Sequence, residues 1–165
     1  KYLLGGNDVN GTEYEKIFYV PRQYKTSSCL VRPICIAHGF EIASLDTLQE
    51  FTTVNLLCLR HKQSFLKNDT VLIDGIAMTK MSKSDWYWTN SGKKINYEME
   101  WAQNQPNFQK QNQWCLSLDQ KSYKFNDIQC QEENHTFLCQ KTQNWCTQNE
   151  GGESRTIKDA DNLDV

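Results

Sequence analysis

The sequence lacks any hydrophobic stretch long enough to cross a membrane. Its apolar runs, such as residues 56–59 and 71–73, are no longer than four residues, whereas a membrane-spanning helix needs about 20 apolar residues. A charged start followed by an apolar segment is also missing, and the first residue is Lys1. We therefore expect a protein without a membrane span, from which any signal peptide has already been removed.

Signatures of common enzymes and of zinc sites are absent as well. The three histidines, His38, His61 and His135, belong to no HExxH motif, and the chain contains neither a GxSxG nor a CxxC sequence. Lone histidines are more often structural than catalytic, so we expect a protein that is not an enzyme.

Concentrated positive charge is missing too. The formal net charge is −2, and residues 147–165 carry five acidic side chains against two basic ones. Nucleic-acid binding needs a clustered basic surface, so we do not expect a nucleic-acid partner. The 165 residues suit one domain. We place it at residues 16–141, after an N-terminal arm (1–15) without periodicity and before an acidic C-terminal tail (142–165).

Cysteines and glycosylation sequons are plentiful in comparison. The chain has seven cysteines, and Asn10, Asn68 and Asn134 each begin an Asn-x-Ser/Thr sequence. Glycosylation and stable disulfides share the secretory compartment, so the combination predicts a secreted, disulfide-bonded glycoprotein. Seven is an odd number, and counting alone does not assign the pairs.

Local patterns predict two helices. Thr26, Ser27 and Ser28 can each cap a helix that ends at Gly39, within which Pro33 predicts a kink or a later start. A second helix is predicted after Asp46, whose side chain can cap it while Gln49 reaches back in a capping box.

Short strands are predicted around these helices. The β-branched and aromatic run 16–20 indicates the first, and further strands are expected at 70–76, 114–118, 123–126 and 136–139. Residues 79–113 show weak periodicity, and an irregular segment of this length in a compact domain indicates a functional loop.

An ordered set of motifs occupies the second half of the chain. It comprises Gln105-Pro106-Asn107, Trp114-Cys115, Phe125-Asn126-Asp127, Cys130 and Phe137-Leu138-Cys139. This order resembles the carbohydrate-binding half of a C-type lectin-like domain. With Cys35, Gly39 and Glu50, which match helix motifs of that family, the similarity covers residues 17–140. It implies an α+β fold in which two helices flank small antiparallel sheets, with a long, partly irregular loop region.

The resemblance also implies disulfides. In that family the first conserved half-cystine bonds to the last and the two middle ones bond to each other, which implies Cys35–Cys139 and Cys115–Cys130. Of the remaining thiols, Cys29 and Cys58 are expected to pair, with Cys29–Cys146 as the alternative. If the first pairing holds, Cys146 stays unpaired in the tail, and we expect a disulfide-linked dimer.

The family's ion site falls on five side chains of this sequence, Gln105, Asn107, Gln113, Asn126 and Asp127. Only Asp127 is a carboxylate, and Ca²⁺ affinity depends on ligand charge. We therefore expect that no cofactor is required and that Ca²⁺ binds weakly or not at all, although Glu98 and Glu100 lie close enough in sequence to compensate. Asn126-Asp127 equally fits a turn that bonds backbone amides. The Gln105–Pro106 peptide bond is often cis in the family.

Three functions follow as hypotheses. The first is a binding module that uses the long-loop surface, with Trp86, Trp88, Trp101 and Phe108, to recognise a glycan or an extracellular protein in innate immune or other recognition. The second is a Ca²⁺-dependent lectin that binds sugar through Gln105-Pro106-Asn107 and Asn126-Asp127. The third, a secreted enzyme, is discounted. The carboxylate count favours the first hypothesis, while Phe108 could either stack on sugar or cover the core of the loop.

Overall fold

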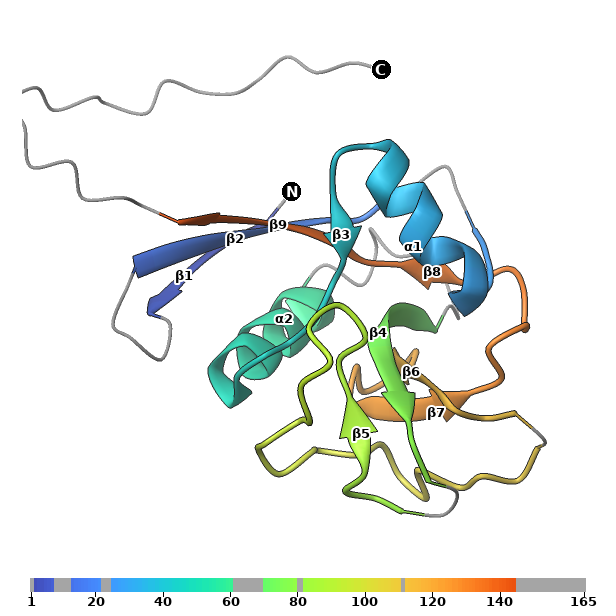
Figure 1. The fold of residues 1–165 in the computed structure, drawn as a ribbon. Coiled ribbons are helices and arrows are strands. Elements are labelled where there is room, and N and C mark those ends of the chain that lie inside the picture. Colours follow the sequence, from blue (N-terminus) through green and yellow to red (C-terminus); the bar gives the residue numbers. More distant parts are fainter. Residues whose placement is uncertain are drawn as a thin grey trace, which may run out of the picture.

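The computed structural model describes residues 2–7, 13–21, 25–60, 70–79, 82–110 and 112–144. Two helices and two small sheets form an α+β fold, which confirms the predicted class. Figure 1 shows α1 (Ser28–Ala37) and α2 (Leu48–Arg60) beside the sheets. Neither of these helices, the only ones in the described part of the chain, has the length and apolar composition needed to cross a membrane.

The first sheet joins the two ends of the domain. Its order is β1 (Tyr2–Asn7), β2 (Glu13–Tyr19), β9 (Cys139–Asn144) and β3 (Glu41–Ile42), and every pairing is antiparallel. The predicted N-terminal arm is therefore wrong for residues 2–7, which form an edge strand of this sheet. Backbone hydrogen bonds hold such a strand, and they leave no periodicity in the sequence. The predicted tail begins at 142, but β9 continues to Asn144; residues 145–165 lie outside the described residues.

The second sheet carries the long loop. Its order is β5 (Trp86–Tyr87), β4 (Val71–Ala77), β6 (Cys115–Leu118) and β7 (Phe125–Ile128), while β8 (Thr136–Phe137) pairs in parallel with β4. The register between β4 and β6 shifts next to Gly75, whose φ is 133°. A Cβ atom there would lie 2.8 Å from Cβ of Leu116, so only glycine fits.

Both helices differ slightly from the sequence prediction. Pro33 lies inside α1, which nevertheless begins at Ser28 and ends before Gly39, a residue with φ of 74°. At α2, Glu50 N donates to Thr47 Oγ1 at 3.1 Å and Asp46 N donates to Glu50 Oε2 at 2.7 Å. The capping pair is therefore Thr47 and Glu50, one residue later than the predicted Asp46 and Gln49.

Two disulfides close the fold. Cys35 bonds Cys139 and Cys115 bonds Cys130, the two pairs that the family resemblance implies. The Cys29–Cys58 pair is wrong, because both thiols are free. Burial of Cys58 in the core raises its pKa to about 12.

The positions of Cys29 and Cys58 explain why they do not form a disulfide. Cys29 is exposed in the first turn of α1, where its backbone N–H and its thiol both approach the carbonyl oxygen of Cys130 at 3.3 Å. Cys58 instead faces the core from α2. Cys146 lies outside the described residues, so the Cys29–Cys146 alternative and the disulfide-linked dimer stay predictions.

Candidate functional site

The candidate site is the long loop, residues 88–114, together with β7. In the part that the structure describes, this loop contains no helix and only isolated strand bridges. Ala102 N donates to Phe125 O at 2.8 Å, and Phe125 N donates to Glu100 O at 2.9 Å. The loop therefore lies against the strand that carries Asn126 and Asp127.

Aromatic side chains form the base of the loop rather than its ligand surface. Trp86 is 0% and Trp88 2% exposed, so the prediction that they contact a ligand is wrong. Trp101 and Phe108 are half-buried and pack on Trp86, with ring centroids 5.3 and 6.2 Å away. A buried loop base and an exposed ligand surface both use large aromatic side chains. The sequence alone therefore does not distinguish the two positions. Of the two roles predicted for Phe108, the structure places it over the core of the loop.

Asp127 fastens the loop to β7 through both carboxylate oxygens. Oδ1 accepts the backbone N–H of Asn107 at 3.0 Å, and Oδ2 accepts that of Phe108 at 2.8 Å. Asp127 is only 2% exposed, and hydrogen bonds to a charged acceptor contribute about 1.5–3 kcal/mol each. We call this pair of hydrogen bonds the Asp127 clasp.

The clasp follows an unusual stretch of backbone. The Gln105–Pro106 peptide bond is cis, and Asn104 and Phe108 have φ of 62° and 48°. Asn107 Oδ1 accepts the backbone N–H of Gln109 at 3.0 Å, which makes a local turn of the kind that asparagine favours. The tripeptide motif therefore shapes the loop through hydrogen bonds within the protein.

The remaining predicted ligand side chains are also engaged locally, with one exception. Gln113 Oε1 accepts the backbone N–H of Lys110 at 2.7 Å, and Asn126 Nδ2 donates to Ser117 Oγ at 3.1 Å. In the described residues, Gln105 Oε1 is buried and has no hydrogen-bond partner. The structure thus brings Asn107 and Asp127 together and uses Gln113 and Asn126 to hold neighbouring backbone and side chains.

This donor set does not fit a calcium ion. Ca²⁺ takes about six to eight oxygen ligands, several of them carboxylates in tight sites. Here Asp127 is the only carboxylate among the five predicted positions, and backbone N–H groups occupy both its oxygens. Glu100 forms an ion pair with Lys124 at 3.2 Å, and Glu98 is exposed. Within the described ranges, no three or more His, Cys, Asp or Glu side chains are grouped to hold a metal.

The outer surface of the loop is rich in amides. Its exposed residues include Gln103, Asn104, Gln109 and Asn112. Trp114, which the sequence marks only as part of the Trp114-Cys115 motif, is 38% exposed at the end of the loop. It is exposed because β6 begins at Cys115, so Trp114 lies just beyond the sheet, a boundary that the sequence pattern places one residue too early.

Comparison with known proteins gives a likeness in structure alone. No protein-family model and no curated protein matches the sequence. The C-type lectin domain of murine dendritic cell inhibitory receptor 2, in complex with N-glycan, superposes with a TM-score of 0.60 at 16% identity, covering 78% of this chain and 91% of that one.

Two further solved structures widen the range of relatives. Human lithostathine gives a TM-score of 0.58 at 20% identity over 77% of this chain and 90% of its own. A calcium-independent type II antifreeze protein gives 0.56 at 21% identity over 86% and 96%. The TM-scores show a common architecture, and identities this low extend the likeness to the fold alone. With its paired disulfides, its two helices and its long loop fastened to β7, the chain has the C-type lectin-like fold.

Proposed function

We propose that this chain is a secreted binding protein that recognises a glycan or an extracellular protein through the surface of the long loop, without relying on Ca²⁺. The observation that carries the proposal is the Asp127 clasp. Its carboxylate already accepts hydrogen bonds from two backbone amides of the loop, so the loop has its shape without an ion. A calcium-independent antifreeze protein has the same architecture, which agrees with a fold that does not need the ion.

The chemistry of the surface favours a glycan among the two ligand classes. The exposed amides of Gln103, Asn104, Gln109 and Asn112 can both donate and accept hydrogen bonds, as sugar hydroxyls do. Trp114 is 38% exposed, and an indole ring can pack on the apolar side of a sugar ring. Binding, rather than catalysis, is the role that this set of neutral groups supports.

A secreted location is supported by two features. Disulfides Cys35–Cys139 and Cys115–Cys130 require an oxidising compartment to persist. Asn134, which begins a sequon, is exposed in a turn with φ of 69°, where a glycan has room. Asn10 and Asn68 lie outside the described residues. Recognition of microbial or self glycans in innate immunity is the setting that we propose.

The second candidate is the Ca²⁺-dependent lectin. One similar domain was solved in complex with N-glycan, and another in the presence of a GlcNAc2Man3 oligosaccharide. For this chain to bind sugar through Ca²⁺, Asp127 would have to release the amides of Asn107 and Phe108 and bind the ion with neutral ligands around it. Because Asp127 would lose both hydrogen bonds of the clasp, we favour ligand binding without a metal ion.

A glycan array in 1 mM Ca²⁺ and in EDTA tests the proposal. We expect the same glycans to bind in both buffers, and Trp114→Ala to weaken binding by about tenfold, the loss of about 1.4 kcal/mol. Tyr19→Ala is the matched control, because Tyr19 is 39% exposed but lies in the other sheet, stacked on Phe40. Binding that EDTA abolishes would contradict the proposal and support the lectin. Binding that survives EDTA but ignores Trp114→Ala would place the ligand elsewhere.

A further inference from the structure

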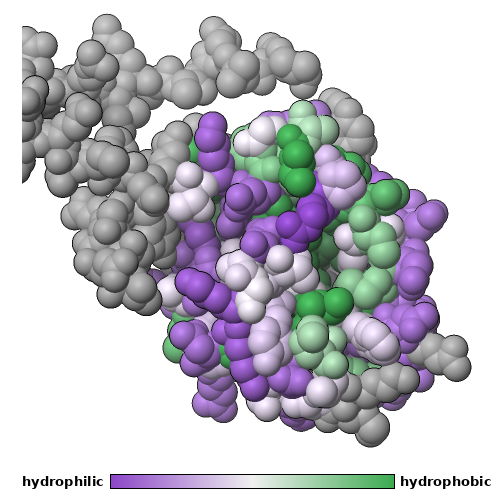
Figure 2. Space-filling view, in the orientation of Figure 1, coloured by the Kyte–Doolittle hydropathy of each residue, from purple (hydrophilic) through white to green (hydrophobic). Residues whose placement is uncertain are grey.

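A second candidate site lies on a different face, where α1 and β3 approach the turn after β5. A cleft of about 160 Å³ there is lined by Arg32, Ile36, Glu41, Ile42 and Asn90. Drug-sized ligands occupy roughly 300–1,000 Å³, so this cleft suits a molecule of amino-acid size. Figure 2 shows strongly hydrophobic and strongly hydrophilic residues next to each other over α1. The lining therefore combines apolar surface with charge.

The positive group of the cleft is held from behind. Arg32 Nη2 donates to Thr89 Oγ1 and lies 3.7 Å from Oδ1 of Asp74, a residue that is 1% exposed. Thr89 Oγ1 in turn donates to the same Asp74 oxygen. Among the described residues, no hydrogen bond uses Nε or Nη1 of Arg32, although a guanidinium has five N–H donors. The guanidinium is fixed in place with donors left for an anion.

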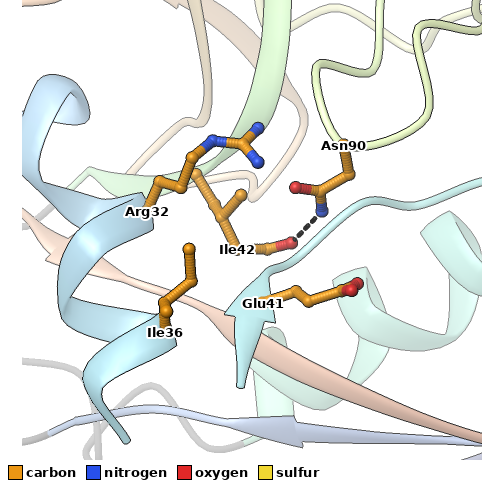
Figure 3. Close-up of a pocket in the computed structure, with 5 residues that line it drawn as sticks. All are labelled: Arg32, Ile36, Glu41, Ile42 and Asn90. Atoms are coloured by element: carbon orange, nitrogen blue, oxygen red, sulfur yellow. Dashed lines mark hydrogen bonds between the residues drawn. The ribbon is translucent and has the colours of Figure 1, made fainter. Parts of the chain in front are cut away.

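Asp74 also fixes the opposite wall. Its Oδ2 accepts the backbone N–H of Asn90 at 2.9 Å, and Asn90 Nδ2 donates to Ile42 O at 2.7 Å. This leaves Asn90 Oδ1 as an acceptor, and Figure 3 shows it on the side that faces Arg32. Burial raises the pKa of Asp74, while hydrogen bonds from Thr89 and Asn90 and the charge of Arg32 lower it. The buried carboxylate thus organises both walls.

A negative group completes the cleft. Glu41 is exposed on β3, and Figure 3 shows its carboxylate and the Arg32 guanidinium on opposite sides of the Asn90–Ile42 hydrogen bond. The described residues contain no ion pair between Glu41 and Arg32 within 4.0 Å. Ile36, which is 59% exposed, and Ile42 supply the apolar part of the lining. Two separated opposite charges around an aliphatic surface match a ligand with the complementary arrangement.

We propose that this cleft binds a small aliphatic zwitterion, an α-amino acid or a dipeptide. Arg32 takes the carboxylate, Glu41 takes the ammonium group, and the aliphatic side chain lies on Ile36 and Ile42. Of the lining residues only Asn90 belongs to the long loop, and it is not one of the exposed amides proposed to bind the first ligand, so the two ligands occupy separate sites.

Titration of the isotope-labelled full chain with L-leucine, followed by NMR, tests the site. We expect the Asn90 side-chain amide and the Ile42 region to shift with a Kd of about 1 mM, and alanyl-leucine in parallel decides between amino acid and dipeptide. Leucinamide lacks the carboxylate and N-acetyl-leucine lacks the ammonium group, so each is expected to bind about tenfold more weakly or worse. Resonances unmoved by both zwitterions at 20 mM, on the order of twenty times that Kd, would overturn the proposal.

Variants separate recognition of the ligand's charges from nonspecific apolar binding. Glu41→Gln is expected to leave the fold intact and to abolish the preference for leucine over N-acetyl-leucine, while Glu98→Gln, also exposed but in the long loop, keeps it. Arg32→Gln is expected to abolish the preference for leucine over leucinamide. Arg32 also faces buried Asp74, so Arg32→Gln can unfold the protein. In that case the result with Glu41→Gln decides the test. Equal binding of leucine and both analogues to the unaltered protein would contradict the assignment.

Discussion

Replacing Lys16 by methionine is expected to lower the free energy of unfolding by about 3–5 kcal/mol. Lys16 is 3% exposed in β2, and its Nζ lies 2.6 Å from Asp46 Oδ2, 2.8 Å from Glu50 Oε2 and 3.1 Å from Ser44 O. Glu50 is itself 2% exposed. Methionine fills the volume of lysine but leaves the Glu50 carboxylate buried without its cation, and an uncompensated buried charge is strongly destabilising.

Urea unfolding monitored by tryptophan fluorescence measures this loss. Lys124→Met is the matched control, because Lys124 pairs with Glu100 at 3.2 Å at the surface, where about 0–1 kcal/mol is expected. The double variant Lys16→Met/Glu50→Gln removes the stranded charge and is expected to be more stable than Lys16→Met alone by about 1 kcal/mol or more. A loss at Lys16 no larger than at Lys124 would show that the buried network contributes little.

Replacing Asp127 by asparagine is expected to cost about 2–3 kcal/mol and to loosen the long loop selectively. Asparagine has the same shape but keeps only one acceptor oxygen, so its NH₂ group must face one of the two backbone N–H groups that the carboxylate holds. One charge-assisted hydrogen bond is lost, and a buried donor is left unpaired. The protection of the Asn107 and Phe108 backbone amides from hydrogen exchange should fall, while the amides of β4 and β6 stay protected.

Asp119→Asn is the control for this variant. Asp119 Oδ2 also accepts backbone N–H groups, from Lys121 and Ser122 at 3.0 and 2.9 Å, but in a local turn that is more open to water. We expect it to cost about 1 kcal/mol and to leave the loop amides protected. Unchanged protection of Asn107 and Phe108 in Asp127→Asn would rule out the clasp as the element that holds the loop.

The sequence allowed the fold to be predicted because its signals are local or ordered along the chain. The spacing of Cys35, Cys115, Cys130 and Cys139 and the capping residues before α2 mark fixed points of the architecture. The capping pair was displaced by one residue because Asp46-Thr47 offers two adjacent caps. Tertiary contact selects Thr47, since the Glu50 carboxylate that completes the cap also binds Lys16.

The site was harder to predict because its chemistry depends on direction. Whether Trp86 faces a ligand or the core, and whether Asp127 faces an ion or two amides, is decided by packing that a motif does not contain. The same holds for Cys29 and Cys58, since bonding needs Cα atoms within about 7 Å and not suitable spacing alone. Asp74 gave no signal as the centre of a cleft, because its partners Arg32 and Asn90 lie far away in sequence.

We propose that the long loop is held by protein groups instead of calcium, and the unfolding free energy in 1 mM Ca²⁺ and in EDTA tests this most directly. With a Kd of about 1 mM or weaker, the ion adds RT ln(1 + [L]/Kd), which is at most about 0.4 kcal/mol. We therefore expect the two values to agree within about 0.4 kcal/mol. A stabilisation of about 2 kcal/mol or more by Ca²⁺, absent in EDTA and absent in Asp127→Asn, would contradict the account and restore Asp127 as a calcium ligand.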